Sequence, residues 1–220
     1  GERTVSFARK PGADTQMRPE EVDTRIIRNS KVFHVGSLSL TDEPARSATM
    51  AALEAAKAAG CVMSYDPNYR SSLWPSAEVA SGHMRSIVGY MDLIKISCEE
   101  CELMCGTTDP QAAAQVLLDQ GAKVVCVTLD ADGAYVATKD GGATVPSFRV
   151  EAVDTTGAGD SFWGGFLCAF VDSRISPADV TLEDAKGFAR FGNAVASLCV
   201  RSRGAIPSMP TLAEVEKVLG

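Results

Sequence analysis

The feature of this 220-residue sequence that most constrains its fold is an alternation of short β-rich runs with helical stretches from residue 31 onward. Strands are predicted at 31–36, 61–66, 91–97 and 123–130, and helical stretches at 43–60, 76–88, 98–106 and 109–122. Connections of this length allow crossovers between parallel strands. The pattern therefore predicts an α/β fold, with a mainly parallel sheet and helices on both of its faces.

Other patterns are predicted outside this region, after residue 132 and in the opening residues. Residues 133–142 and 143–154 have the character of hairpin-like edge strands, and helices are predicted at 158–171, 181–200 and 211–219. The opening residues 3–9 alternate polar and apolar side chains, as a half-exposed strand does. We therefore expect a partial lid strand segment over 1–15 and an α/β portion over 16–220.

Composition excludes several classes of protein. The formal charge is −7 and the acids are spread along the chain, which argues against general affinity for nucleic acid or an anionic membrane. No apolar run approaches the roughly 20 residues that span a bilayer. The seven cysteines form no disulfide framework, and no export signal opens the chain, so a cytoplasmic protein is expected.

Ligands of open parallel sheets bind beyond the carboxyl ends of the strands. That rule nominates four segments of this sequence, each directly after a predicted strand. They are GSLSL (36–40), DPNYR (66–70), SCEE (97–100) and LDADG (129–133).

The run DTTGAGD, residues 154–160, is the strongest candidate for chemistry. A Gly-Ala-Gly turn that enters a helix exposes backbone N–H groups without intervening side chains, and these donors bind anions. Asp160 then falls in the first helical turn, where a negative charge is favoured. A carboxylate beside an anion hole suits phosphoryl transfer, because it can accept the proton of an attacking hydroxyl. The alternative is a structural Gly-rich turn with a capping acid.

Two other patterns raise the question of a metal site or a further catalytic residue. Cys98, Cys101 and Cys105 form C-x-x-C-x-x-x-C, which invites a metal or iron–sulfur interpretation. On a helix these offsets fall on one face, so the thiols are more simply explained as small buried residues, and neither histidine lies nearby. His34, inside an apolar strand, is interpreted as a satisfied core residue.

Several separated motifs resemble those of one family. DTTGAGDSFWGGFL resembles the C-terminal signature of the ribokinase-like (PfkB) sugar kinases, while SYDPNYRSSLWPS, FHVGSLSLTDEPARS and RGAIPSMP resemble its fructokinase branch. The resemblance implies a ribokinase-like three-layer fold with the remnant of a small β lid. It also implies ATP- and Mg²⁺-dependent phosphorylation of a sugar, foremost fructose to fructose 6-phosphate. The family's first strands, with a Gly-Gly sugar-binding motif, are expected to be absent from these residues.

By that resemblance Asp160 is the general base, and Gly157, Ala158 and Gly159 form the anion hole. The segment that lines the nucleotide supplies Thr128, Leu129, Asp130 and Gly133, and Asn193 lies near the adenine. The family usually has glycine where Asp130 stands.

The resemblance assigns further residues to sugar and metal sites. Phe7, Arg9, Asn68 and Arg70 face the sugar together with Asp160. Glu100 organises Mg²⁺ through water, although Ser97 replaces the usual asparagine of that motif. Asp154, Thr156, Gly204 and Ser208 surround a monovalent cation such as K⁺. Structural turns and a solvated glutamate are the alternatives from sequence alone.

The expected partners are a small sugar and ATP, and the sequence leaves a homodimer open. Rival functions are a kinase for 2-keto-3-deoxygluconate or ribose, and a truncated, non-catalytic kinase-like module. The intact Asp160 argues against that module, whereas Asp130 and Ser97 keep it open.

Overall fold

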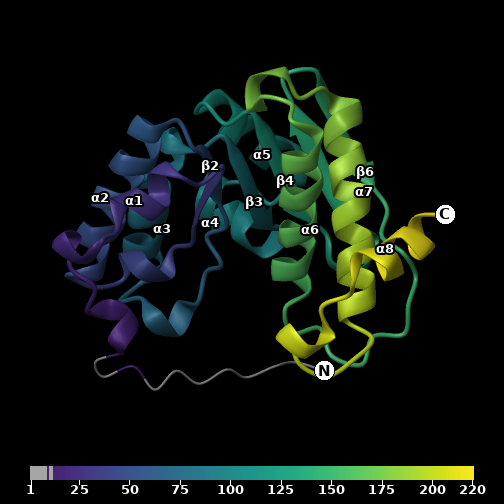
Figure 1. The fold of residues 1–220 in the computed structure, drawn as a ribbon, viewed down its shortest axis with the longest axis horizontal. Coiled ribbons are helices and arrows are strands. Elements are labelled where there is room, and N and C mark those ends of the chain that lie inside the picture. Colours follow the sequence, from purple (N-terminus) through teal and green to yellow (C-terminus); the bar gives the residue numbers. More distant parts are fainter. Residues whose placement is uncertain (1–8, 10–11) are drawn as a thin grey trace. The chain divides into compact units, whose positions relative to one another are not determined.

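The computed structural model describes residue 9 and residues 12–220, and the chain divides into two compact units, Gly1–Asp92 and Leu93–Gly220. Figure 1 shows the elements of both units. Phe7 and the predicted lid strand up to residue 8 lie outside the described residues. Ala13–Thr15, within the predicted lid segment, form a short 3₁₀ helix.

The first unit is built around a parallel pair of strands. In β1 (Val32–Val35) and β2 (Val62–Tyr65), Val32 pairs with Val62 and Val35 with Tyr65. The unit's helices are α1 (Thr24–Arg28), α2 (Ala45–Ala59) and α3 (Ala77–Ser86), with 3₁₀ helices at Ala13–Thr15, Pro19–Glu21, Leu38–Leu40, Ser71–Leu73 and Val88–Tyr90. The Ala-rich helix α2 ends at Gly60 because this residue takes a left-handed backbone (φ 74°) that glycine adopts without steric cost.

The second unit contains β3 (Leu93–Ser97), β4 (Val124–Thr128), β5 (Ala134–Thr138) and β6 (Gly141–Val145). β3 and β4 are parallel, whereas β4, β5 and β6 are antiparallel. The helices are α4 (Cys101–Cys105), α5 (Pro110–Asp119), α6 (Ala158–Ser173), α7 (Leu182–Cys199) and α8 (Leu212–Leu219), with 3₁₀ helices η6 (Cys98–Glu100), η7 (Asp130–Asp132), η8 (Pro177–Asp179) and η9 (Ile206–Ser208). Figure 1 shows α6 and α7 side by side in front of these strands and α5 behind them.

The core of the second unit joins the strands to α6 and α7. Side chains at 93, 94, 96 and 124–127 are buried, and an aromatic cluster fills the space beside them. Phe166 stacks on Trp163 at 4.8 Å and meets the edge of Phe188 at 5.6 Å. Burial of each such ring contributes about 2–3 kcal/mol. The helices approach closely at Gly192, where a Cβ atom would lie 2.6 Å from the carbonyl oxygen of Phe162.

Most predicted strands and helices are confirmed, with three differences. The edge strand expected over 143–154 ends at Val145, because Pro146 offers no N–H group to continue a ladder. Gly141 and Gly142, expected in the strand before it, belong to this second strand. The short helix α1 was not predicted. His34 is hydrogen-bonded through Nδ1 to Ser64 Oγ at 3.0 Å, as expected, but it is exposed and not a core residue.

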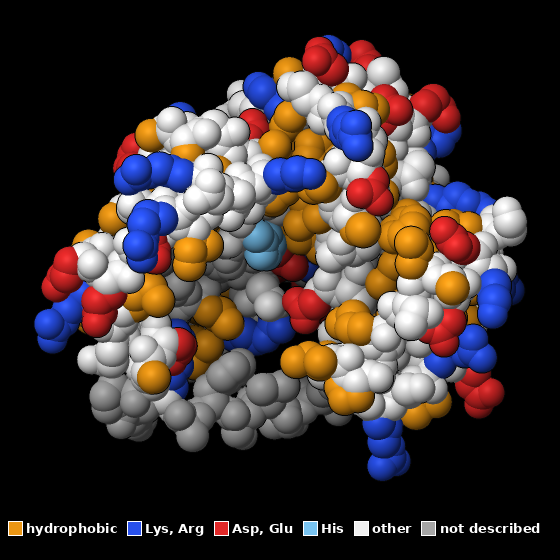
Figure 2. All heavy atoms as spheres, viewed as in Figure 1, with side chains coloured by type: hydrophobic (Ala, Val, Ile, Leu, Met, Phe, Trp, Pro, Cys, Tyr) orange, Lys and Arg blue, Asp and Glu red, His pale blue; other side chains and the backbone are white. Residues whose placement is uncertain are grey.

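Within the part of the chain that the structure describes, the helices are all too short or too polar to cross a bilayer. Lys and Arg side chains are interspersed with Asp and Glu over the face drawn in Figure 2. The mixture of signs on that face agrees with the spread of charge along the sequence.

Candidate active site

The start of helix α6 is shaped by two glycines. Gly157 has a left-handed backbone (φ 79°), and a Cβ atom there would lie 2.6 Å from Cβ of Ala205. At Gly159 a Cβ atom would lie 3.2 Å from Nζ of Lys95. Any side chain at these two positions would fill the space directly in front of the helix start, so the glycines keep the backbone open there.

Backbone N–H groups at this helix start are available to a ligand. The first N–H groups of a helix have no acceptor within the helix. Among the described residues, the N–H groups of Gly157, Gly159 and Asp160 donate to no acceptor, whereas that of Ala158 donates to Thr155 O at 3.2 Å. The predicted anion hole therefore has the glycine amides and that of Asp160 as its donors, and the amide of Ala158 is already engaged.

Lys95 brings a positive charge to the same place and was missed by sequence reasoning. It lies in the middle of β3, opposite Cys126 of β4, and it is only 6% exposed. Its ammonium group reaches the backbone of Gly159, at the positive end of the helix dipole. A buried cation at this end of a helix is unfavourable unless anionic groups offset it. The sequence signal that could have pointed to Lys95 is a charged residue inside the mainly apolar strand LIKIS.

Asp160 lies in the first turn of α6 and is exposed to solvent. Its position directly after the open amides is the one predicted from the sequence. An exposed carboxylate can meet an incoming hydroxyl group, and a negative charge is favoured at the start of a helix. The helix start can thus hold an anion beside a proton acceptor.

Asp154 ties the segment before α6 to the segment before α8. Its Oδ2 accepts a hydrogen bond from Gly204 N at 2.9 Å, and its Oδ1 accepts from Thr156 N at 2.9 Å and from Thr156 Oγ1 at 2.7 Å. In the second segment, Ser208 Oγ donates to Arg203 O at 3.1 Å. The structure thus brings together three of the four residues that the resemblance assigns to a monovalent cation, and places Ser208 on the same loop as Gly204.

The loop after β4 is a closed turn. Leu129 N donates to Gly133 O at 2.8 Å, and Thr128 Oγ1 donates to Ile96 O of β3 at 3.4 Å. Asp130 has a left-handed backbone (φ 51°), which is uncommon for a residue other than glycine. At Gly133 (φ 103°) a Cβ atom would lie 2.1 Å from Val145 O, so the turn requires glycine there.

Glu100 and Asn193 have structural partners. Glu100 is 6% exposed, and its Oε2 accepts from Ser97 N at 2.8 Å, so this carboxylate caps the turn that follows β3. Asn193 is 3% exposed and donates through Nδ2 to Val145 O at 3.0 Å and to Pro146 O at 3.2 Å. Their contacts with Mg²⁺ and with adenine stay predictions.

The cysteines do not gather around a metal. All seven are free thiols, and across residues 12–220 together with residue 9 no three His, Cys, Asp or Glu side chains are close enough to hold an ion. Burial, with smaller contributions from neighbouring Cys105 and Cys98, raises the pKa of the Cys101 thiol to about 12. Cys101 is therefore protonated at neutral pH and behaves as a small core residue.

Three of the residues predicted to bind the sugar, Arg9, Asn68 and Arg70, lie in the first unit. The loops after β1 and β2 are joined there by a hydrogen bond from Ser37 N to Pro67 O at 3.0 Å. Arg9 donates to Leu38 O at 3.0 Å and to Thr41 Oγ1 at 3.2 Å, which brings it to the same edge.

The next loop of the same unit carries Asn68 and Arg70. Asn68 adopts a left-handed backbone (φ 49°) and donates through its N–H group to Asp66 Oδ1 at 3.2 Å. Arg70 donates to Tyr69 O at 2.8 Å. Arg9 is thus bonded to the loop after β1, and Asn68 and Arg70 lie on the loop after β2; their contact with a sugar stays a prediction.

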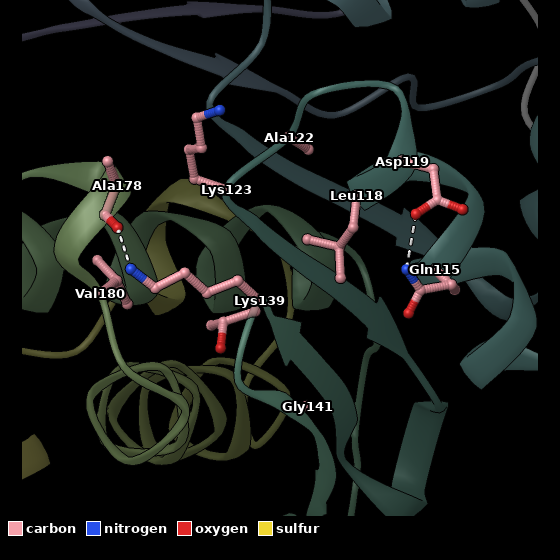
Figure 3. A pocket seen from close by; sticks show the side chains of 10 residues that line it. Gln115, Leu118, Asp119, Ala122, Lys123, Lys139, Gly141, Ala178 and Val180 are labelled. Atoms are coloured by element: carbon pink, nitrogen blue, oxygen red, sulfur yellow. Dashed lines mark hydrogen bonds between the residues drawn. The ribbon is translucent and has the colours of Figure 1, made fainter.

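The second unit contains a cavity of about 490 Å³ (Figure 3). It is found at the amino end of β4, where Lys123 precedes the strand, and at the carboxyl end of the antiparallel strand β5. Lys139, on its rim, donates to Ala178 O at 3.0 Å, and Asp119 accepts from Gln115 at 2.8 Å. None of the predicted site residues lines this cavity, so it is not the candidate active site.

Comparisons with known proteins agree with these observations. A family model described as "pfkB family carbohydrate kinase" matches residues 1–212. The chain is 43% identical over 224 residues to the probable fructokinase-4 of Arabidopsis thaliana, covering 100% of this chain and 67% of the relative. It spans between 61% and 67% of the first curated relatives that it matches.

Solved structures are similar over nearly the whole chain. A fructokinase with bound ATP from Xylella fastidiosa has a TM-score of 0.89 and 33% identity, covering 99% of this chain and 70% of that chain. A fructokinase double mutant from Vibrio cholerae O395, bound to fructose, ADP and potassium ion, has a TM-score of 0.87 and 29% identity, covering 98% and 68%. These similarities confirm the predicted α/β, ribokinase-like fold.

Proposed function

Because this chain belongs to the PfkB family of carbohydrate kinases, we propose that the protein transfers the γ-phosphoryl group of ATP to the primary hydroxyl of fructose, giving fructose 6-phosphate. The observation that carries the proposal is the open helix start of α6. Backbone amides without an acceptor among the described residues lie there, the buried ammonium of Lys95 is close to Gly159, and Asp160 follows directly in the same helical turn.

The glycine amides and Lys95 hold negative charge as it moves during the transfer. Phosphoryl transfer depends chiefly on positioning and on stabilising charge that spreads over the phosphoryl oxygens. Fixed N–H donors require no rearrangement during the reaction. Lys95 is buried, so its charge acts with less screening than that of a surface lysine.

Asp160 accepts the proton of the attacking sugar hydroxyl. As its O–H bond breaks, the new bond between the sugar oxygen and the γ-phosphorus forms, and ADP leaves on the opposite side. Asp160 follows the anion hole directly in sequence, so the base and the phosphoryl group are held by one rigid helical turn.

The residues of this chain fit the groups that the family implies. ATP supplies the γ-phosphoryl group, and its phosphates match the cradle that a side chain at Gly159 would fill. Glu100 offers a hard carboxylate at the edge of β3, and since Ser97 N already occupies one of its oxygens, Glu100 would hold Mg²⁺ through water. Arg9, Asn68 and Arg70 would bind the sugar.

The test of the proposed substrate is a coupled assay of ADP release across fructose, ribose and 2-keto-3-deoxygluconate. We expect kcat/KM for fructose to exceed the others by about ten-fold or more, because each misplaced hydroxyl leaves a polar group unpaired. Faster turnover of ribose or 2-keto-3-deoxygluconate would replace the fructose assignment. No sugar-dependent ADP release in any arm would favour a non-catalytic binding module.

We further propose that a monovalent cation occupies the loops tied by Asp154 and activates the enzyme. The chemistry of such a site, mainly oxygen ligands, suits K⁺-like ions, and the related Vibrio cholerae fructokinase was solved with potassium ion bound. A cation beside the helix start would strengthen its attraction for phosphate. We expect kinase rates in K⁺ buffer to exceed those in choline buffer by about ten-fold, a ratio typical of a local charge of this kind.

A variant of Asp154 is the control for the cation experiment. Asp154→Asn removes the charge that ties the two segments together and is expected to reduce the ratio between K⁺ and choline rates. Equal rates in K⁺, Na⁺ and choline buffers would contradict the proposed activation.

A further inference from the structure

Asp130 occupies an unfavourable backbone conformation at the edge of the nucleotide segment. Its φ of 51° lies in the left-handed region, which costs a residue with a Cβ atom about 1–2 kcal/mol relative to glycine. The residue is exposed, and it opens the short helix η7 directly after β4. None of the hydrogen bonds among the described residues joins its side chain to a neighbour that would offset this cost.

Asp130 lies at the carboxyl ends of two neighbouring parallel strands, β3 and β4. Thr128 pairs with Ser97 in the parallel register, so the residues after β4 and β3 lie side by side. Asp130 comes two residues after Thr128, and Cys98 comes directly after Ser97, so both residues lie at the same edge of the sheet. Asp130 thus adds a fixed negative charge at the strand ends, where ligands of parallel sheets bind.

We propose that Asp130 makes the protein selective for metal-complexed nucleotide over free nucleotide. This inference rests on the proposed ATP site. A fixed carboxylate repels a polyphosphate in proportion to the negative charge of that polyphosphate. Mg²⁺ neutralises part of the charge, so the free nucleotide is rejected more strongly than its magnesium complex. Asp130 therefore acts as a specificity-determining residue for the form of the phosphate donor.

Binding measurements test this without relying on turnover. The dissociation constants of ATP would be measured by calorimetry, in excess Mg²⁺ and in EDTA, for the wild type, Asp130→Asn, Asp130→Gly and Asp132→Asn. Asparagine tolerates the left-handed backbone and removes only the charge, whereas glycine removes the conformational cost as well. Asp132 is an exposed acid in the same short helix, so its variant is the matched control.

The quantity of interest is the ratio of the free-ATP to the Mg–ATP dissociation constant. We expect this ratio to fall by about three- to ten-fold in both Asp130 variants, since charges several ångströms apart at a surface interact by about 1 kcal/mol. It should be unchanged in Asp132→Asn. The difference between Asp130→Asn and wild type should shrink at high salt, where the Debye length falls to about 3 Å.

Two results would overturn the inference. An unchanged ratio in Asp130→Asn, with Mg–ATP still bound, would show that the carboxylate does not discriminate between the two forms. An equal fall in Asp132→Asn would assign the effect to the general charge of the turn. Failure of the wild-type protein to bind ATP under either condition would instead refute the proposed function, and the inference with it.

Discussion

Replacing Asp160 by asparagine is expected to lower kcat by about 10²-fold or more while nucleotide binding is largely kept. The variant keeps the size of the side chain and its place in the first turn of α6 but cannot accept a proton from the sugar hydroxyl. The amides of Gly157 and Gly159 belong to the backbone and are unchanged, so ATP retains its anion site. Steady-state kinetics and ATP calorimetry on the same preparation would measure both quantities.

The matched control for this variant is Asp172→Asn. Asp172 is also an exposed acid on α6, but it lies near the end of the helix. We expect its replacement to leave kcat within about two-fold of wild type, since surface substitutions away from a site have small effects. Turnover that survives in Asp160→Asn would remove the assignment of a general base.

Alanine at Gly133 is expected to reduce the free energy of unfolding by about 3 kcal/mol or more. The new Cβ atom would lie 2.1 Å from Val145 O and 2.6 Å from Ser147 N, both in the backbone. The glycine φ of 103° adds strain for any residue with a side chain. Relief requires the turn after β4 to move away from the end of β6, which also disturbs the nucleotide segment. Urea unfolding followed by circular dichroism would measure the loss.

The variant Gly141→Ala separates the effect of backbone strain from that of steric overlap. Gly141 also has a positive φ (123°) and lies on the same hairpin, but a Cβ atom there meets nothing within 4 Å. Its replacement should cost about 1 kcal/mol, from backbone strain alone. Equal losses in the two variants would contradict the close contact at Gly133.

The strands and the longer helices could be predicted because their signals are local. The run from Val124 to Thr128 is β-branched apart from one cysteine, and the helix that starts at Ala158 follows a glycine turn. The helix α1 escaped prediction because its five residues, Thr24–Arg28, are too few to show a helical period. The predicted continuation of the strand beyond Val145 is wrong because Pro146 cannot donate a ladder hydrogen bond.

The parts of the site that escaped prediction depend on contacts between distant residues. Nothing near Lys95 in sequence indicates that its ammonium lies close to Gly159, because the two residues are 64 positions apart and meet only in the folded chain. Similarly, the side chain of Asn193 donates hydrogen bonds to carbonyl groups that lie 48 and 47 residues earlier in the sequence. The spacing of a motif can nominate residues for a ligand site. It does not reveal which hydrogen bonds those residues make within the folded protein.

The link from Asp154 to Gly204 joins positions 50 residues apart. Through this hydrogen bond, the segment before α8 supports the turn that opens α6. A deletion that removes Gly204 would therefore loosen the start of α6, although α8 itself contributes none of the residues proposed to act on the substrates.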